Sequence, residues 1–260
     1  MKNYSNKKFL SFGLILFILL GSITSFAQLK KYKKFKLNLV EGLDTLGLQT
    51  GDLAFFQNTS FYGQMTQIGT LSPFTHSSMI VVAEDSSILL THATNNDYGG
   101  FLIPVIGENK PRNGVILTRL GDLFASYDYG KTGAYKHIWI RKLKDSKIKR
   151  PNSKKVLQLY EKYKEHPFES SLLNFILSAF DLKIHNKDLL SFPADQEWMC
   201  SEYLCHLFVD LSFPFKFKEP PNETTPVDIY TLIGDFYEDP IIYEFQNGKY
   251  ILISENTGKK

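Results

Sequence analysis

The sequence of residues 200–211 is CSEYLCHLFVDL. Counted from Cys200, the positions i+4, i+7 and i+11 are Leu204, Leu207 and Leu211, which is the spacing of one face of an α-helix. The preceding residues 191–197, SFPADQE, disfavour a long helix, so Cys200 is expected within the first turn. We therefore predict an amphipathic helix whose apolar face, including Cys200, packs against a sheet.

The remainder of the chain predicts mostly strands. Apolar and aromatic runs bounded by polar turns predict strands at 53–56, 77–82, 88–93, 115–118 and 137–143, and a closing hairpin at 241–245 and 249–253 around Gln246-Asn247-Gly248. A helix is expected over 153–164 with Asn152 or Ser153 as its cap. The apolar segment 172–180 predicts a buried helix or the lining of an apolar pocket. Strands outnumber helices, so we predict an α+β domain with a largely antiparallel sheet.

Two histidines lie on the predicted hairpin formed by 77–82 and 88–93. If its strands pair symmetrically about Glu84, His76 lies directly opposite His92, with Cβ atoms about 4.5 to 5.5 Å apart. One imidazole can then hydrogen-bond and orient the other. A slip of one residue would send His92 to the opposite face, so this contact depends on the register.

Cys200, His76 and His92 together supply the parts of nucleophilic acyl transfer. These parts are a thiol, an imidazole to take its proton and a third group to hold that imidazole. A helix start favours the thiolate, and the backbone N–H groups of Cys200 and Ser201 can receive an oxyanion. The spacing alone leaves open a cysteine that only packs in the core and a histidine that is only a surface polar group.

The two cysteines of the chain are Cys200 and Cys205. On one helix their Cα atoms would be about 8 to 9 Å apart, beyond the limit of about 7 Å for a disulfide. Exported proteins normally oxidise their thiols in pairs, so two free thiols are explained if one is catalytic. Cys205 lies off the apolar face that contains Cys200 and is expected to be a packing residue.

Residues 1–27 predict a secretory signal peptide. Lys2, Lys7 and Lys8 precede the apolar run 9–20, and Ser-Phe-Ala at 25–27 is a small-x-small cleavage signature. The apolar run is shorter than the roughly 20 residues that span a bilayer. We therefore expect a periplasmic or secreted protein with no stable membrane span after cleavage.

Cleavage would leave residues 28–260, which contain no Gly/Ser-rich or Pro-rich linker and predict a single domain. The leader removes three lysines and no acidic residue, so 27 basic and 27 acidic residues remain. A net charge of zero argues against nucleic acid as a partner. The sequence does not indicate an oligomeric state.

Several segments resemble the permuted papain-like amidases, and more narrowly the YiiX/YebB-type (C92) group, which is related to the NlpC/P60 superfamily. In chain order they are GDL at 51–53, THSSM at 75–79 and MCSEYL at 199–204. In addition, HPFE at 166–169 resembles that group's Pro-Tyr-Asp stretch before the nucleophile. TPVD at 225–228 resembles its Thr/Ser-Pro-x-Asp stretch after the nucleophile.

This resemblance implies an NlpC/P60-like core in which the Cys helix packs on a sheet that bears the histidine. By position it implies Cys200 as nucleophile, His76 as general base and then acid, and His92 as the orienting polar residue, without a cofactor. Many relatives carry an acidic residue in place of His92, and an aromatic residue where Met199 stands. The segments 94–136 and 172–180 look like additions.

Several functions remain open. The leading one is a cysteine hydrolase of the amidase or peptidase type, acting through an acyl-Cys200 intermediate on an amide or ester carbonyl, with cell-wall peptides as candidate substrates. A thiol-dependent lipid acyl hydrolase or acyltransferase is an alternative, because permuted relatives include lipid acyltransferases and 172–180 can accept an acyl chain. A zinc site of one Cys and two His lacks the usual local spacings. A non-catalytic binding module of the same fold is the last.

Overall fold

The computed structural model describes residues 36–37, 40, 43–95, 103–127, 132–168, 183–184, 187–188 and 198–254. The chain divides into two compact units, Met1–Lys33 and Lys34–Lys260, and every described residue belongs to the second. The predicted leader and the apolar segment 172–180 lie outside the described residues, so the leader and the single-domain boundaries stay predictions. Within the described part, no helix combines the length and the apolar character needed to cross a membrane.

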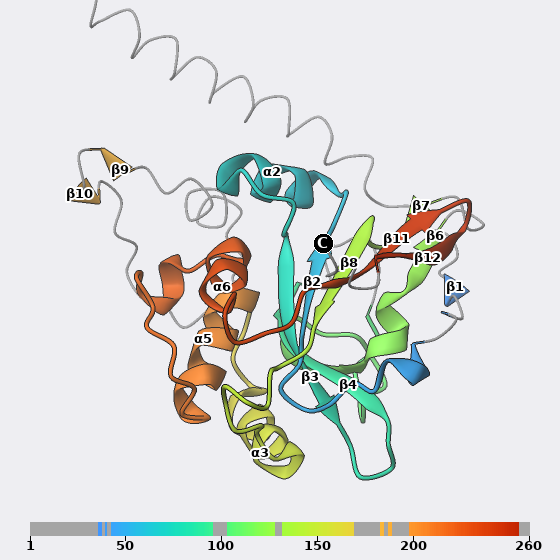
Figure 1. The fold of residues 1–260 in the computed structure, drawn as a ribbon. Helices are drawn as coiled ribbons and strands as arrows, with labels where there is room; N and C mark the ends of the chain where they lie inside the picture. Colours follow the sequence, from blue (N-terminus) through green and yellow to red (C-terminus); the bar gives the residue numbers. More distant parts are fainter. Residues whose placement is uncertain are drawn as a thin grey trace, which may run out of the picture. The chain divides into compact units, whose positions relative to one another are not determined.

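A seven-stranded antiparallel sheet forms the centre of the second unit (Figure 1). Its strands, in spatial order, are β12 (Lys249–Ser254), β11 (Ile241–Gln246), β8 (His137–Arg141), β2 (Leu53–Gln57), β3 (His76–Val82), β4 (Ile88–Thr94) and β5 (Gly114–Arg119). Every strand predicted from the sequence is present, which confirms the α+β class with an antiparallel sheet. Short strands form two further sheets, one of β1 (Lys36–Leu37), β6 (Ala125–Tyr127) and β7 (Thr132–Gly133), the other of β9 (Lys183–Ile184) and β10 (Lys187–Asp188).

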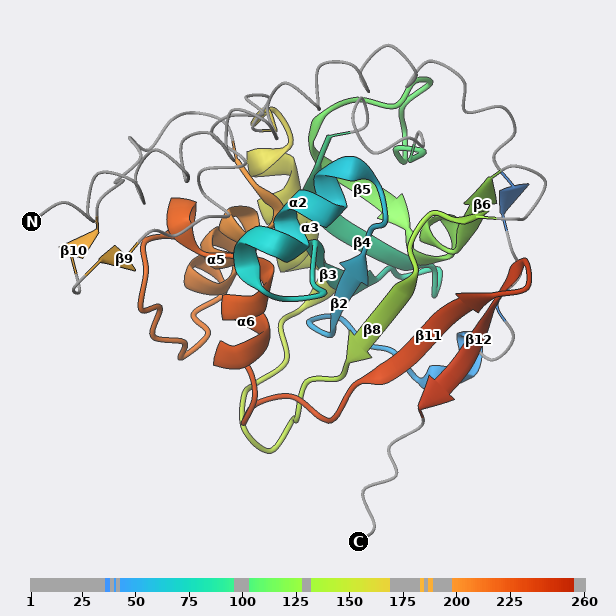
Figure 2. The same ribbon diagram turned by 90° about the horizontal axis from the view of Figure 1, so that it is seen from above.

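Four α-helices accompany the sheet in the described residues: α2 (Phe61–Thr70), α3 (Ser153–Tyr163), α5 (Cys200–Asp210) and α6 (Pro226–Leu232). Single 3-10 turns, η2 (Asp44–Leu46), η3 (Leu120–Leu123) and η5 (Pro221–Glu223), join other elements. Asn152 caps α3 as expected, because its side chain accepts a hydrogen bond from the N–H of Lys154 at 2.8 Å. Figure 2 shows α5 and α6 side by side and β12 at the outer edge of the sheet.

Side chains alternate between the two faces of the sheet, and each face has its own core. On one face, Phe55, Met79 and Val81 pack with residues of α3 and α5. On the other face, Phe56 and Ile80 pack with residues of η3, β6 and the two C-terminal strands. Helices α3 and α5 therefore cover one face of β3, as Figure 1 also shows.

The pairing of β3 with β4 differs from the predicted register. Ile80 lies opposite Leu90, whereas the symmetric hairpin about Glu84 placed it opposite Ile88. The prediction is wrong by two residues, and His76 does not lie directly opposite His92. Because the shift is even, both histidines keep the same face of the sheet and become diagonal neighbours.

The turn between these strands explains the shift. The backbone N–H of Ala83 donates to the carbonyl of Ser87 at 3.0 Å, which leaves a three-residue loop centred on Asp85. The Asp85 side chain accepts a hydrogen bond from the N–H of Ser87 at 2.9 Å, and Ser86 has a φ of 66°. A three-residue hairpin loop requires a left-handed residue at its end, and Ser86 supplies it without a glycine to mark the position in the sequence.

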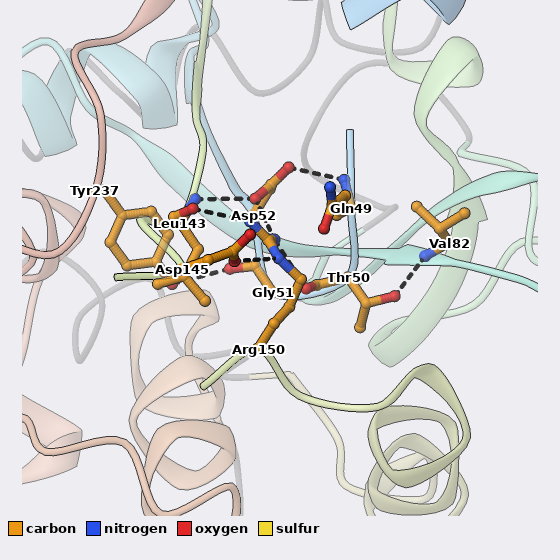
Figure 3. Close-up of polar contacts among 9 residues, drawn as sticks. All are labelled: Gln49, Thr50, Gly51, Asp52, Val82, Leu143, Asp145, Arg150 and Tyr237. Carbon is orange, nitrogen blue, oxygen red and sulfur yellow. Dashed lines mark hydrogen bonds and ion pairs between the residues drawn. The ribbon is translucent and has the colours of Figure 1, made fainter. Parts of the chain in front are cut away.

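A buried carboxylate fixes the start of β2, as Figure 3 shows. Asp52 accepts hydrogen bonds from the backbone N–H groups of Gln49 at 2.8 Å and Leu143 at 2.9 Å. Its Oδ1 also accepts from Nη1 of Arg150 at 2.6 Å. The hydroxyl of Tyr237 donates to the carbonyl of Gly51 at 2.9 Å. This Asp52 cluster ties β2 to the end of β8 and to the segment that precedes α3.

Candidate active site

Cys200 is the first residue of α5, as the sequence predicts. Met199 is the N-cap in extended conformation, and its backbone N–H donates to Glu202 Oε2 at 3.4 Å in a capping box. Cys200 is 6 % exposed, and Cys205 on the same helix is fully buried. Both thiols are free, which confirms that they do not pair, and Cys205 is a packing residue.

The two histidines meet on one face of the sheet. Nε2 of His76 and Nδ1 of His92 are 2.7 Å apart, and their rings are nearly perpendicular, at 73°. Both side chains are buried. Phe56 lies opposite His76 across the β2–β3 pairing, and the ring centroids are 5.6 Å apart. The structure therefore brings together His76 and His92 in spite of the shifted register.

Cys200 lies on the other face of the sheet from this pair, beside the first residues of β3. The face covered by α5 is marked by Thr91, whose hydroxyl lies 2.7 Å from the hydroxyl of Tyr203. Ser77 lies on that face, and its backbone N–H hydrogen-bonds to Cys200. Ser77 and His76 are consecutive in β3 and point to opposite faces of the sheet, so this contact places the thiol beside the backbone next to His76. The hydrogen bonds found among the described residues include none between the thiol and either ring, a contact that in many enzymes tightens only with substrate.

Burial controls the charge of all three groups. It raises the pKa of the Cys200 thiol, and hydrogen bonds from backbone N–H groups, that of Ser77 foremost, oppose this only in part. The expected thiolate at the helix start is therefore wrong for the resting site, because burial outweighs the helix terminus. Burial also lowers the pKa of His76 to about 3, and burial followed by the charge of His76 lowers the pKa of His92 well below its ordinary value. At neutral pH the site holds a neutral thiol and two neutral imidazoles.

One proton lies between the two rings, and its position decides what His76 can do. If Nε2 of His76 carries it and donates to Nδ1 of His92, then Nδ1 of His76 is free to accept a proton from a thiol. If His92 donates instead, His76 carries its own proton on Nδ1 and cannot act as a base. The first arrangement is the competent one.

A stack of three rings holds the residue two positions before the nucleophile. Trp198 lies between His166, at 3.9 Å between centroids, and His206, at 4.4 Å, with nearly parallel planes. The N–H of Trp198 donates to the carbonyl of Pro167 at 2.9 Å. The sequence analysis did not predict that His166 and His206 stack on Trp198. The one indication was the resemblance of the segment HPFE at 166–169 to the family pattern. The stack fixes the chain that enters α5, and so the position of Cys200.

The same atoms fit a zinc ion poorly. Two nitrogens that bind one tetrahedral zinc at about 2.0 to 2.1 Å are about 3.3 Å apart, whereas those of His76 and His92 are in direct hydrogen-bond contact at 2.7 Å. Across the described ranges, no three or more His, Cys, Asp or Glu side chains are grouped to hold a metal ion.

Comparisons with known proteins bear on the fold. No family model matches the sequence, and no curated protein matches it. Among solved structures, the chain is similar to the crystal structure of metalloprotein yiiX from Escherichia coli O157:H7. The two share 16 % sequence identity over 80 % of this chain and 98 % of that chain, with a TM-score of 0.38. The likeness concerns the fold alone and carries no information about activity.

Proposed function

We propose that the protein is an exported cysteine hydrolase of the permuted papain-like type. Cys200 is its nucleophile, His76 its general base and then acid, and His92 holds His76 in place. The observation that carries the proposal is the hydrogen bond of 2.7 Å between two buried, neutral imidazoles at the end of β3. The first residue of α5, a thiol, packs beside that strand end.

In the first half of the reaction, the Cys200 sulfur attacks the substrate carbonyl while its proton moves to Nδ1 of His76. The imidazolium is stabilised by Nδ1 of His92, which accepts the hydrogen bond from Nε2 of His76. The N–H groups of Cys200 and Ser201 at the start of α5 can stabilise the oxyanion. Collapse of the intermediate expels the amine, thiol or alcohol, which takes the proton from His76.

In the second half, His76 takes a proton from water as the water attacks the acyl-Cys200 thioester. The thiol leaves and regains that proton, so the site returns to its neutral resting state. His76 begins as a weak base, but each thiolate formed beside it raises its pKa by electrostatic attraction. Proton transfer and attack are therefore coupled, and no stable ion pair is needed beforehand.

Cell-wall peptide amides are the proposed substrate class, and acyl lipids are the alternative. Two activity probes separate them: a peptide electrophile and an acyl-lipid analogue with the same reactive group. Labelling of Cys200 by the peptide probe supports the amidase. Labelling by the lipid probe alone would replace it with a lipid acyl hydrolase or acyltransferase.

The catalytic assignment is tested by alkylation of Cys200 with iodoacetamide at pH 7.5, read by mass spectrometry with Cys205 as the internal reference. His76→Ala should slow modification of Cys200 by about tenfold or more. His137→Ala is the matched control, because His137 lies on β8 and bonds to Gln57 instead, at 2.6 Å. Equal rates in the parent protein and in both variants would indicate a non-catalytic binding module.

A further inference from the structure

The hydroxyl of Ser77 is a buried polar group without a partner. Ser77 is fully buried, and its Oγ makes no hydrogen bond within the part of the chain that the structure describes. Met79 and Val81, which follow it on the same face of β3, belong to the apolar core. Phe55, which lies opposite Ser77 on β2, offers no side-chain acceptor. Because buried polar groups are nearly always hydrogen-bonded, a lone hydroxyl on this apolar face requires an explanation.

Cys200 is the polar group beside this hydroxyl. Helix α5 packs against β3, and Cys200 is its first residue. The backbone N–H of Ser77 hydrogen-bonds to Cys200, and the Ser77 hydroxyl is close enough to lower the pKa of the thiol in the same direction, although burial raises it more. In the resting site the hydroxyl nevertheless makes no hydrogen bond to the sulfur. It is therefore close to a bond that the neutral thiol does not complete.

The charge of the sulfur determines how strong such a hydrogen bond is. A neutral thiol is a weak donor and a weak acceptor, so it gains little from a neighbouring hydroxyl. A thiolate can only accept, and hydrogen bonds to an ionised acceptor are about twice as strong as those between neutral groups. The direction of the bond is thus fixed, with the oxygen as donor and the sulfur as acceptor. Since the hydroxyl has no other partner among the described residues, forming this bond breaks none there.

We propose that Ser77 is a further catalytic residue, whose hydroxyl donates a hydrogen bond to the Cys200 sulfur when the thiol loses its proton. The proton still moves to His76, and Ser77 keeps its own. The N–H and the O–H of Ser77 together stabilise the sulfur as it attacks the carbonyl, and again as it leaves the thioester. This inference rests on the proposed function and deepens it, because it names a group that stabilises the sulfur anion within a buried site.

The test is the pH profile of Cys200 alkylation by iodoacetamide, measured on the full chain with His76→Ala present so that only the sulfur is titrated. Adding Ser77→Ala should move the midpoint to higher pH by about one unit, which corresponds to the loss of one hydrogen bond to a charged group. Ser77→Thr keeps the hydroxyl and should restore the midpoint. Ser78→Ala is the matched control, because Ser78 is also fully buried but points to the other face, where its hydroxyl donates to the carbonyl of Ala54 at 3.4 Å.

Two other ionisable groups respond to the charge of Cys200. Burial raises the pKa values of Tyr135 and Cys205, and the charge of Cys200 raises them further. Both groups are therefore protonated between pH 6 and pH 10, and both are the same in every variant. A difference in midpoint between Ser77→Ala and Ser78→Ala then reports on the Ser77 hydroxyl.

Melting temperatures separate this role from a structural one. A buried hydroxyl without a partner does not stabilise the resting fold, so Ser77→Ala should keep or raise the melting temperature. An unchanged midpoint in Ser77→Ala, or an equal shift in Ser78→Ala, overturns the proposal, as does a shift that comes with a lowered melting temperature and is not restored by Ser77→Thr. Failure of the proposed function is distinguishable, since in that case His76→Ala alone leaves the alkylation rate at pH 7.5 unchanged, whatever the midpoints of the Ser77 variants.

Discussion

Asp52→Asn tests how much burial increases the contribution of an ion pair to the free energy of unfolding. Asp52→Asn keeps the shape of the side chain and one carbonyl oxygen, but it removes the charge that faces Arg150. It also places an amide NH₂ or a neutral oxygen where the carboxylate accepts from the N–H of Gln49. The side chain of Asp52 is 1 % exposed, so water cannot replace what is lost.

Removing one partner of a buried ion pair costs about 3 to 5 kcal/mol. Arg150 keeps hydrogen bonds to the carbonyls of Thr50 at 3.1 Å and Leu143 at 2.8 Å, and an ion pair with Asp145 at 2.8 Å. The lower end, about 3 kcal/mol, is therefore expected. For a domain of this size that corresponds to a fall of roughly 6 to 12 °C in melting temperature.

The matched control is Glu108→Gln. Glu108 pairs with Arg112 at the same distance of 2.6 Å, but these side chains are 32 % and 28 % exposed. An exposed pair four residues apart contributes about 0.5 kcal/mol or less. Urea unfolding followed by tryptophan fluorescence measures both variants. A loss below about 1 kcal/mol for Asp52→Asn, or equal losses in the two variants, would refute the reasoning.

Three further outcomes are expected. The pKa of His76 is about 3 in the folded protein and about 6.5 in the unfolded chain, so below pH 6.5 the unfolded state binds more protons and the free energy of unfolding decreases as the pH is lowered. In urea titrations, His76→Gln should reduce the decrease between pH 7 and pH 5 by about 2 kcal/mol. An unchanged decrease would contradict the inference that burial lowers this pKa. In His76→Ala, the alkylation rate of Cys200 should rise with pH, and the midpoint of this curve should lie above the pKa of roughly 8.5 of a free cysteine, because burial raises the pKa of this thiol. A midpoint below that value would indicate that the helix terminus stabilises the thiolate more than burial opposes it. Gly63→Ala should lower the melting temperature strongly, because a Cβ there would lie 2.2 Å from the carbonyl oxygen of Asn58, whereas Gly121→Ala, with open space around its Cβ, should not.

Much of the fold was accessible from the sequence because burial imposes periodicity. The run from Leu53 to Phe56 and the hairpin strands are buried on both faces, and the apolar runs 53–56, 79–82 and 88–90 mark them in the sequence. The residues 191–197, which disfavour a long helix, located the start of α5 correctly, and the spacing of Leu204 and Leu207 from Cys200 identified its buried face. The closing hairpin followed from Asn247-Gly248, which both adopt positive φ as a two-residue turn requires.

Other features depend on contacts that no local pattern encodes. Helix α2 contains Gly63 and Gly69, which disfavour a helix. Hydrogen bonds to the preceding segment support it, because Ser60 caps its start and Gln67 donates to the carbonyl of Asn58 at 3.0 Å. The hairpin register depends on the left-handed backbone conformation of Ser86, and a serine in the sequence does not predict that conformation. The raised pKa of Cys200 follows from its burial in the folded protein, whereas the helix start alone predicts the opposite direction.

The Asp52 cluster also constrains the order in which the chain can fold. Asp52 bonds to Leu143 and Arg150, 91 and 98 positions later, and the Gly51 carbonyl accepts from Tyr237, 186 positions later. Loops of this length close slowly, and their contacts contribute only after closure. We therefore expect the cluster to form late, so that its loss speeds unfolding more than it slows folding. On that expectation, the beginning of the first long strand becomes fully fixed only when residues near the end of the chain have joined it.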